Sequence, residues 1–260
     1  MIKLENTEVV GWEHAIRGMR NPMNSWEKSD SAYCHRDLER DCTTCVHHFA
    51  TGYSACISGG FDIGPKDFDL MTRLRNSGTD HRKFMRMITV YLDITAPLYW
   101  WKEFDTYKVG TVANSCSTMH KIHEKEFTLD DFSHEHLIYD GIGDNNEAIW
   151  YKDPPENGPI KCQLMFTPLD ALRITIGVLN TNREAYLKTK NKKYWEQMIQ
   201  LLPSSYNQKR TVMLNYEVLA NIYKSRRNHK LDEWRELCKW IESLPYSELI
   251  TGDDKKSTND

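Results

Sequence analysis

The clearest periodic pattern in the chain lies between Met87 and Thr95. Apolar residues alternate there with Thr, Tyr and Asp, and a period of two predicts a strand with one buried face. The dipeptide Ala96-Pro97 follows, and a cluster of aromatic residues between positions 99 and 107 then indicates a helix. Small hydroxyl and amide residues come next. We therefore expect a strand, an aromatic helix and a polar loop in one continuous unit.

Shorter signals mark the other elements. Residues 2–12 look like a strand, and the polar segment from Arg17 to Asp30, interrupted by Pro22, predicts a loop. Helical spacing or capping residues predict five further helices: one capped by Asp67, one that begins at Thr167-Pro168-Leu169-Asp170, one from Tyr194 to Leu202, one through Val212, Tyr216, Leu219 and Tyr223, and one from Trp234 to Ile241.

Composition excludes some classes of protein. The 260 residues include 34 basic and 37 acidic ones, a net charge of −3, so the overall charge does not favour bulk nucleic acid or a membrane surface. No apolar run reaches the length of a membrane span, and the first residues lack a signal peptide. We expect a cytoplasmic protein, in the host cytoplasm if a phage encodes it, with one domain over residues 1–250 and a disordered tail over 251–260.

The seven cysteines include a local cluster. Cys42 and Cys45 have C-x-x-C spacing, two histidines follow them, and Cys34 and Cys56 flank them. Zinc takes four nitrogen or sulfur ligands in a tetrahedron, and this Cys-rich insertion near residues 34–60 can supply them. The alternative is a loop with free thiols, because no second Cys or His pair stands at the usual spacing.

The aromatic helix and the polar run after it are the first candidate for ligand chemistry. Aromatic rings offer stacking faces, and short polar side chains beside them donate and accept hydrogen bonds. Such a surface suits a planar, oxygen-rich ligand such as a nucleotide or a flavin. The alternative is a core helix with its exit loop. The candidate residues are Trp100, Trp101, Tyr107, Thr111, Asn114, Ser115 and Ser117.

Basic residues form the second candidate. Arg17 and Arg20, with Ser25 nearby, lie in the polar segment, and guanidinium groups match phosphate oxygens. A solvated surface loop is the alternative. A second group, His81, Arg82, Lys83 and Arg86, precedes the alternating strand, and Lys102 follows the tryptophans. These side chains either face solvent or bind an anionic ligand.

The order of these parts resembles that of the flavin-dependent thymidylate synthases. Members carry a His before a strand that ends in Ala-Pro, an aromatic helix, and the signature RHRxxSxNExSxR. His81 stands at the matching distance before Ala96-Pro97, and Lys108 and Thr111 match the third basic residue and the first Ser. With one inserted residue, Asn114 and Ser117 match the Asn and the second Ser.

The C-terminal half adds more spaced matches. The family shows a Leu-Pro, an Asn twelve residues later, an Arg at the end of that helix and a Trp seven residues further on. The matching residues here are Leu202-Pro203, Asn215, Arg226-Arg227 and Trp234. The chain is similar to a diverged member of the family, of phage or prophage type.

The resemblance implies an α+β fold in which long helices flank an antiparallel sheet, bound FAD and a homotetramer. It also shows departures. Thr106 and Tyr107 replace an Arg and a His that handle phosphates, and Glu103 replaces the Gln that contacts the nucleotide base. Each lost charge-assisted hydrogen bond weakens phosphate binding by about 1.5 to 3 kcal/mol.

Three functions follow from the matches and departures. The first is a non-catalytic protein that binds a nucleotide or a dinucleotide-like small molecule and sequesters a nucleotide signal. The second is an active FAD-dependent thymidylate synthase or related pyrimidine nucleotide methyltransferase, with Arg226 or Arg227 as the residue that orients the base. The third is an oligomer without a ligand.

Overall fold

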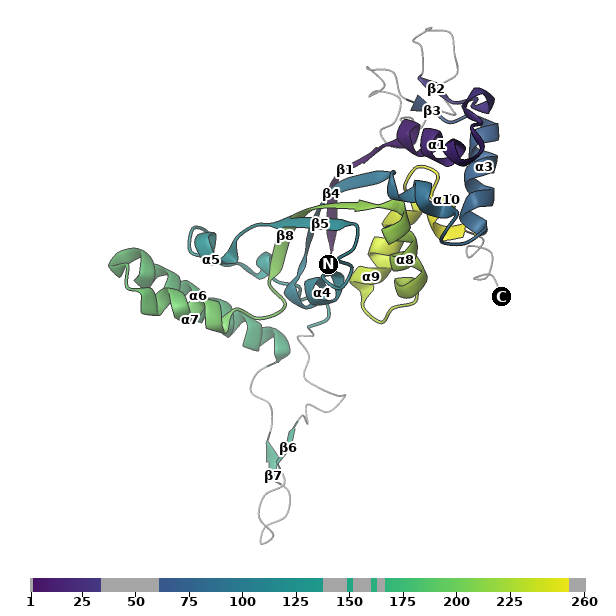
Figure 1. The fold of residues 1–260 in the computed structure, drawn as a ribbon. Helices are drawn as coiled ribbons and strands as arrows, with labels where there is room; N and C mark the ends of the chain where they lie inside the picture. Colours follow the sequence, from purple (N-terminus) through teal and green to yellow (C-terminus); the bar gives the residue numbers. More distant parts are fainter. Residues whose placement is uncertain (1, 34–60, 138–148, 152–159, 163–166, 253–260) are drawn as a thin grey trace, which may run out of the picture. The chain divides into compact units, whose positions relative to one another are not determined.

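The computed structural model describes residues 2–33, 61–137, 149–151, 160–162 and 167–252 (Figure 1). The chain divides into two compact units, which we call unit 1 and unit 2. Apart from Met1, unit 1 comprises Ala96–Lys102 and Ser115–Lys209, and unit 2 comprises Ile2–Thr95, Glu103–Asn114 and Arg210–Asp260. The single domain and the disordered tail stay predictions. None of the helices in these described ranges is both long and apolar enough to cross a membrane.

Unit 2 holds most of a four-stranded antiparallel sheet with the order β1-β4-β8-β5. The strands are β1 (Lys3–Val10), β4 (Thr89–Pro97), β5 (Thr111–Ser115) and β8 (Asn207–Asn215). In β4 the predicted alternation is confirmed, since Val90, Leu92 and Ile94 are buried while the residues between them are partly or fully exposed. The α+β class is confirmed as well.

Two local predictions were wrong in this sheet. The polar run after the aromatic helix α4 (Leu98–Phe104) is the edge strand β5 rather than a loop, and four of its five residues are exposed. Val212 lies in β8 and not in a helix, because the helix α8 (Tyr216–Arg226) begins only after Asn215. Asn215 caps α8, and its side chain accepts a hydrogen bond from the Val218 backbone amide at 3.1 Å.

The segment from Arg17 to Asp30 begins in a helix, which corrects the predicted loop. Helix α1 (Trp12–Arg20) buries an apolar stripe at helical spacing, comprising Trp12, Ala15, Ile16 and Met19. Two 3-10 turns, η1 (Asn21–Met23) and η2 (Trp26–Lys28), follow α1. The short strands β2 (Ala32–Tyr33) and β3 (Phe61–Asp62) then pair with each other.

A buried ion pair joins α1 to α3 (Pro65–Asn76). Arg20 Nε donates to Asp67 Oδ1 at 2.6 Å, and the two side chains are 5% and 0% exposed. Asp67 Oδ2 accepts from the hydroxyls of Ser29 and Ser31 at 2.6 and 2.7 Å. Asp67 is therefore a central hydrogen-bond acceptor and not the N-cap that we predicted, since Gly64 occupies the cap position.

The helices at the C-terminal end of unit 2 cover apolar side chains. Helix α8 packs against α9 (Asp232–Glu242), α10 (Glu248–Thr251) and the 3-10 turn η4 (Arg82–Arg86). Tyr216 on α8 meets Trp12 edge to face with ring centroids 5.3 Å apart, and its hydroxyl donates to the Pro245 carbonyl. The predicted helix from Trp234 to Ile241 is confirmed as α9.

Unit 1 is built on an antiparallel helix pair, α6 (Pro168–Thr189) and α7 (Lys192–Leu201) (Figure 1). The predicted start of α6 is confirmed, because Thr167 and Asp170 form a capping box with Pro168 at the first helical position. The remaining elements of the unit are α5 (Thr118–Lys121), η5 (Leu129–Asp131), β6 (Ile149–Tyr151) and β7 (Ile160–Cys162). Its core includes Ile122, Phe127, Phe132, Leu172, Leu179 and Met198.

Candidate functional site

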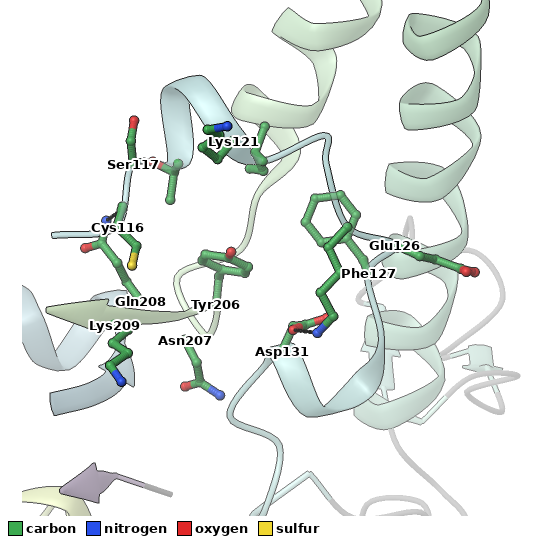
Figure 2. A pocket seen from close by; sticks show the side chains of 13 residues that line it. Cys116, Ser117, Lys121, Glu126, Phe127, Asp131, Tyr206, Asn207, Gln208 and Lys209 are labelled. Atoms are coloured by element: carbon green, nitrogen blue, oxygen red, sulfur yellow. Dashed lines mark hydrogen bonds and ion pairs between the residues drawn. The ribbon is translucent and has the colours of Figure 1, made fainter. Parts of the chain in front are cut away.

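A pocket of about 210 Å³ opens beside Ser117 in unit 1, and we call it the Ser117 pocket. Figure 2 shows the Tyr206 ring within the group of lining side chains, with Ser117 and Lys121 near α5 and Asp131 across from them. The backbone frame is fixed by two hydrogen bonds. The Cys116 amide donates to the Lys209 carbonyl at 2.9 Å, and Gln208 Nε2 donates to the Cys116 carbonyl at 3.0 Å.

Cations outnumber anions around this pocket. Lys121, Lys125 and Lys209 line it, against the carboxylates of Glu126 and Asp131. Lys125 Nζ donates to Asp131 Oδ1 at 2.9 Å, and Lys121 Nζ pairs with Glu124, which does not line the pocket. Three lysines with neighbouring hydroxyl and amide groups can hold a phosphate-bearing ligand.

The ionisation of the pocket follows from its contacts. Burial alone would raise the pKa of Asp131, but hydrogen bonds from Lys125 and Thr128 lower it below its usual value. Asp131 therefore stays negative at neutral pH. Burial raises the pKa of the Tyr206 phenol, and the negative charge of Asp131 raises it further. Tyr206 thus stays protonated and can donate a hydrogen bond.

A second cluster, which we call the Arg226 cluster, lies in unit 2. Arg226 Nη1 donates to Glu103 Oε2 at 2.8 Å, and Arg226 Nε donates to the Tyr107 hydroxyl at 2.9 Å. Trp234 Nε1 donates to the same Glu103 oxygen at 2.9 Å, and the guanidinium carbon lies 4.7 Å from the Trp234 ring centroid. His229 Nε2 is 3.5 Å from that oxygen. Glu103 thus collects donors from the end of α8 and from α9.

Arg227 belongs to different surroundings from Arg226. Its charge acts on Tyr223 and Cys238, which lie on α8 and α9. Burial first, and then a 2.6 Å hydrogen bond to Glu242, raises the pKa of the Tyr223 phenol. The hydrogen bonds to Glu103 and Tyr107 described above are those of Arg226.

The basic residues before β4 gather around one carboxylate. Arg82 Nε lies 3.5 Å from Glu217 Oε1, and Arg86 forms a hydrogen bond to Glu217 as well. His81 and Lys83 are exposed. The carboxylate of Glu217 offsets part of the positive charge that the sequence places here.

The arginines of α1 differ from each other. Arg20 is buried, and besides Asp67 it donates to the carbonyls of Ser25 and Lys28 at 3.2 and 3.1 Å. Every nitrogen of its guanidinium therefore has an acceptor. Arg17 is exposed on the same helix.

The remaining predicted residues are spread over both units. Trp100 and Trp101 are 0% and 1% exposed, and Trp101 Nε1 donates to the Gln208 carbonyl at 3.0 Å. Lys102, Lys108, Asn114 and Ser115 are exposed, whereas the Thr111 hydroxyl is buried without a partner among the described residues. Burial leaves the two indole rings no free face for a ligand in unit 1.

Metal ligands do not gather in the part of the chain that the structure describes, where no group of three or more His, Cys, Asp or Glu side chains forms a candidate site. Cys34, Cys42, Cys45 and Cys56 lie outside the described residues, so the predicted zinc site stays a prediction.

Sequence reasoning missed most of the Ser117 pocket. The pocket joins Lys121, Lys125 and Asp131 to Tyr206 and Lys209, which lie far away in the chain. Asp131 belongs to the capping box Thr128-x-x-Asp131, which marks a helical turn and not a pocket. Ser117 could have been recognised as an N-cap, since Ser is a preferred residue there. In the structure its hydroxyl accepts a hydrogen bond from the His120 amide at 3.1 Å. That signal marks a helix start and does not mark a pocket.

Comparison with known proteins identifies the fold of this chain. No family model matches the sequence, and no curated protein matches it. Among solved structures, the flavin-dependent thymidylate synthase ThyX from Helicobacter pylori, complexed with FAD and dUMP, is 15% identical, with a TM-score of 0.57 over 97% of this chain and 98% of that chain. The UMP/dUMP methylase PolB from Streptomyces cacaoi, bound with 5-Br dUMP, is 13% identical, with a TM-score of 0.51 over 96% of this chain and 95% of that chain. This chain has the same fold.

Proposed function

We propose that this protein is a diverged relative of the flavin-dependent thymidylate synthases that binds a nucleotide-like small molecule without making thymidylate. The Ser117 pocket carries the proposal. Ser117 stands where the family signature has its second Ser, and around it the chain gathers three lysines and several neutral polar groups. A nucleotide phosphate fits that chemistry, and the Ser117 pocket would hold it.

The Arg226 cluster argues against the family's reaction. Arg226 already donates to Glu103 and Tyr107, and Glu103 puts a negative charge beside it. An anionic ligand that uses Arg226 must compete with Glu103 for the guanidinium. A carboxylate also accepts hydrogen bonds only, whereas the Gln that it replaces also donates. The affinity for a uracil nucleotide at Arg226 should therefore be reduced.

The residues also fit flavin poorly. Tyr107 stands where the family signature has its His. The Tyr107 hydroxyl accepts a hydrogen bond from Arg226, and the Tyr107 ring centroid lies 5.7 Å from the Arg226 guanidinium carbon. Lys108 is the single positive charge left in that triplet. The proposal includes a homotetramer, which the family resemblance implies, and the sequestration of a nucleotide signal as the role of the bound ligand.

The alternative is an active FAD-dependent enzyme. It is favoured by the near-complete coverage of both chains in the comparisons with a thymidylate synthase and a nucleotide methylase. The two readings differ in one property of the purified protein. An active flavoenzyme is yellow and releases flavin on denaturation, whereas the proposed binder is colourless and releases a nucleotide detectable by mass spectrometry.

The site is tested by titration calorimetry with dUMP. Lys121→Gln removes a cation from the Ser117 pocket, and a lost charge-assisted hydrogen bond of about 1.5 kcal/mol weakens binding about tenfold. Lys192→Gln is the matched control, because Lys192 is similarly exposed, at 76% against 66% for Lys121, pairs with Glu196 as Lys121 pairs with Glu124, and does not line the pocket. Equal affinities of both variants and the parent would contradict the proposed site. A protein that forms an oligomer but binds no nucleotide would support the third function, an oligomer without a ligand.

A further inference from the structure

A second pocket, of about 430 Å³, lies in unit 2, and we call it the Trp26 pocket. Residues of α1, of the turn η2 and of the paired strands β2 and β3 line it. Figure 1 draws β2 and β3 next to α1. Its volume falls in the range of about 300 to 1,000 Å³ that is typical of small-molecule sites. The residues that matter for its chemistry are Glu13, Ile16, Arg17, Trp26, Tyr33 and Phe61.

Two exposed aromatic rings in this pocket are held in place. Trp26 is 48% exposed, and its Nε1 donates to Asn21 Oδ1 at 2.8 Å. Tyr33 is 55% exposed, and its hydroxyl donates to Glu13 Oε2 at 2.6 Å. The Tyr33 ring also meets Phe61 edge to face at a centroid distance of 5.2 Å. Rings that are already ordered lose little conformational entropy when a planar ligand stacks on them.

Two charged groups of the pocket, Arg17 and Glu13, have hydrogen-bonding capacity that no other described residue uses. Arg17 is exposed and has no acceptor among the described residues. Neighbouring Arg20 is saturated by Asp67, Ser25 and Lys28, so Arg17 is the guanidinium available to a ligand. Glu13 uses Oε2 to accept from Tyr33, and within the described part of the chain its Oε1 has no donor. A ligand can thus place an anionic group on Arg17 and an N–H donor on Glu13.

We propose that the Trp26 pocket binds a nucleoside monophosphate whose base carries an exocyclic amino group. The base stacks on the aromatic side chains, the amino group donates to Glu13 and the phosphate accepts from Arg17. This site is distinct from the Ser117 pocket, with which it shares no residue. The inference does not rest on the proposed function.

AMP is the probe, because its purine gives a large stacking face and its amino group suits Glu13. The full chain is labelled with 5-fluorotryptophan, and the fluorine resonance of Trp26 is assigned from its absence in Trp26→Phe. AMP should shift that resonance saturably. Adenosine and ribose 5-phosphate, which each lack one half of the ligand, should bind at least about tenfold more weakly, and UMP, which lacks the amino group, should also bind more weakly than AMP.

Two variants separate the pocket from other effects. Arg17→Gln should raise the dissociation constant for AMP about tenfold, as expected for a lost charge-assisted hydrogen bond. Arg73→Gln removes an exposed arginine from α3, outside the pocket, and should leave the dissociation constant for AMP unchanged. A Trp26 resonance that millimolar AMP does not move, or an affinity that Arg17→Gln leaves intact, overturns the inference. If Lys121→Gln alone weakens AMP binding, the ligand occupies the Ser117 pocket and only the proposed function survives.

Discussion

Replacing Asp67 should destabilise unit 2 far more than replacing its neighbour Asp69. Asp67 is fully buried and accepts hydrogen bonds from Arg20, Ser29 and Ser31, as well as from the backbone amides of residues 30 and 31. In Asp67→Asn the Arg20 charge, 5% exposed, stays buried without its counter-ion. Breaking a buried pair in this way costs about 3 to 5 kcal/mol of the free energy of unfolding.

Asp69→Asn is the matched control on the same helix. Its ion pair with Arg73 is exposed, at 66% and 67% of the side-chain surfaces, and such i,i+4 pairs contribute about 0.3 to 0.5 kcal/mol. Urea unfolding followed by tryptophan fluorescence measures both variants against the parent. If the two substitutions lower the free energy of unfolding by similar amounts, below about 1 kcal/mol, the reasoning about burial is refuted.

The same residue predicts a dependence on pH. Burial alone would raise the pKa of the Asp67 carboxyl, but hydrogen bonds from Ser29, Ser31 and Arg20 bring it below its usual value of 3.8. A lowered pKa in the folded state stabilises the protein above the unfolded-state pKa, and this contribution is lost as the pH falls through the folded-state value. The difference between parent and Asp67→Asn should therefore be constant from pH 7 to about pH 5 and shrink below about pH 4.

Three further predictions concern single sites. Gly177→Ala on α6 should raise the free energy of unfolding by about 0.5 to 1 kcal/mol, measured in urea, because no atom lies within 4 Å of the added Cβ and Ala favours helix; a destabilised variant would contradict this. Asn215→Ala removes the N-cap of α8 and should lower the free energy of unfolding in urea by about 1 kcal/mol. An unchanged free energy of unfolding would show that the cap contributes nothing. At pH 8, iodoacetamide should modify exposed Cys116 and spare buried Cys238, whose pKa is raised to about 12 by burial and by Glu242 against the opposing charge of Arg227; peptide mass spectrometry reads both, and rapid native labelling of Cys238 would refute its burial.

Sequence patterns predicted elements where one periodicity was unambiguous. The alternation that became β4 and the capping residues that begin α6 each point to one structure. The errors arose where two patterns overlap. Val212, Tyr216 and Leu219 have helical spacing by coincidence, since Val212 and Leu214 are the buried residues of a strand that ends where the helix begins.

Polar composition misled the other two assignments. Strand β5 is an edge strand with four of its five residues exposed, Val112 among them, so no alternation of apolar and polar residues is visible. Pro22 and the arginines suggested a loop, yet Arg17 and Arg20 lie within α1, whose buried apolar stripe is interleaved with them and which ends before Pro22. The Ser117 pocket depends on long-range contacts between residues 116–131 and 206–209, and a single sequence carries no signal for such contacts.

The pairing of β2 with β3 has a consequence for how this chain can change. Ala32 opposite Asp62 and Tyr33 opposite Phe61, with Asp67 bound to Arg20 a few residues away, fix both ends of the stretch from 34 to 60. Tyr33 is thereby tied to two elements at once, because its ring meets Phe61 on β3 and its hydroxyl donates to Glu13 on α1. A substitution at Tyr33 should therefore loosen β2 from β3 and from α1 together, so evolution can reshape these three elements only jointly.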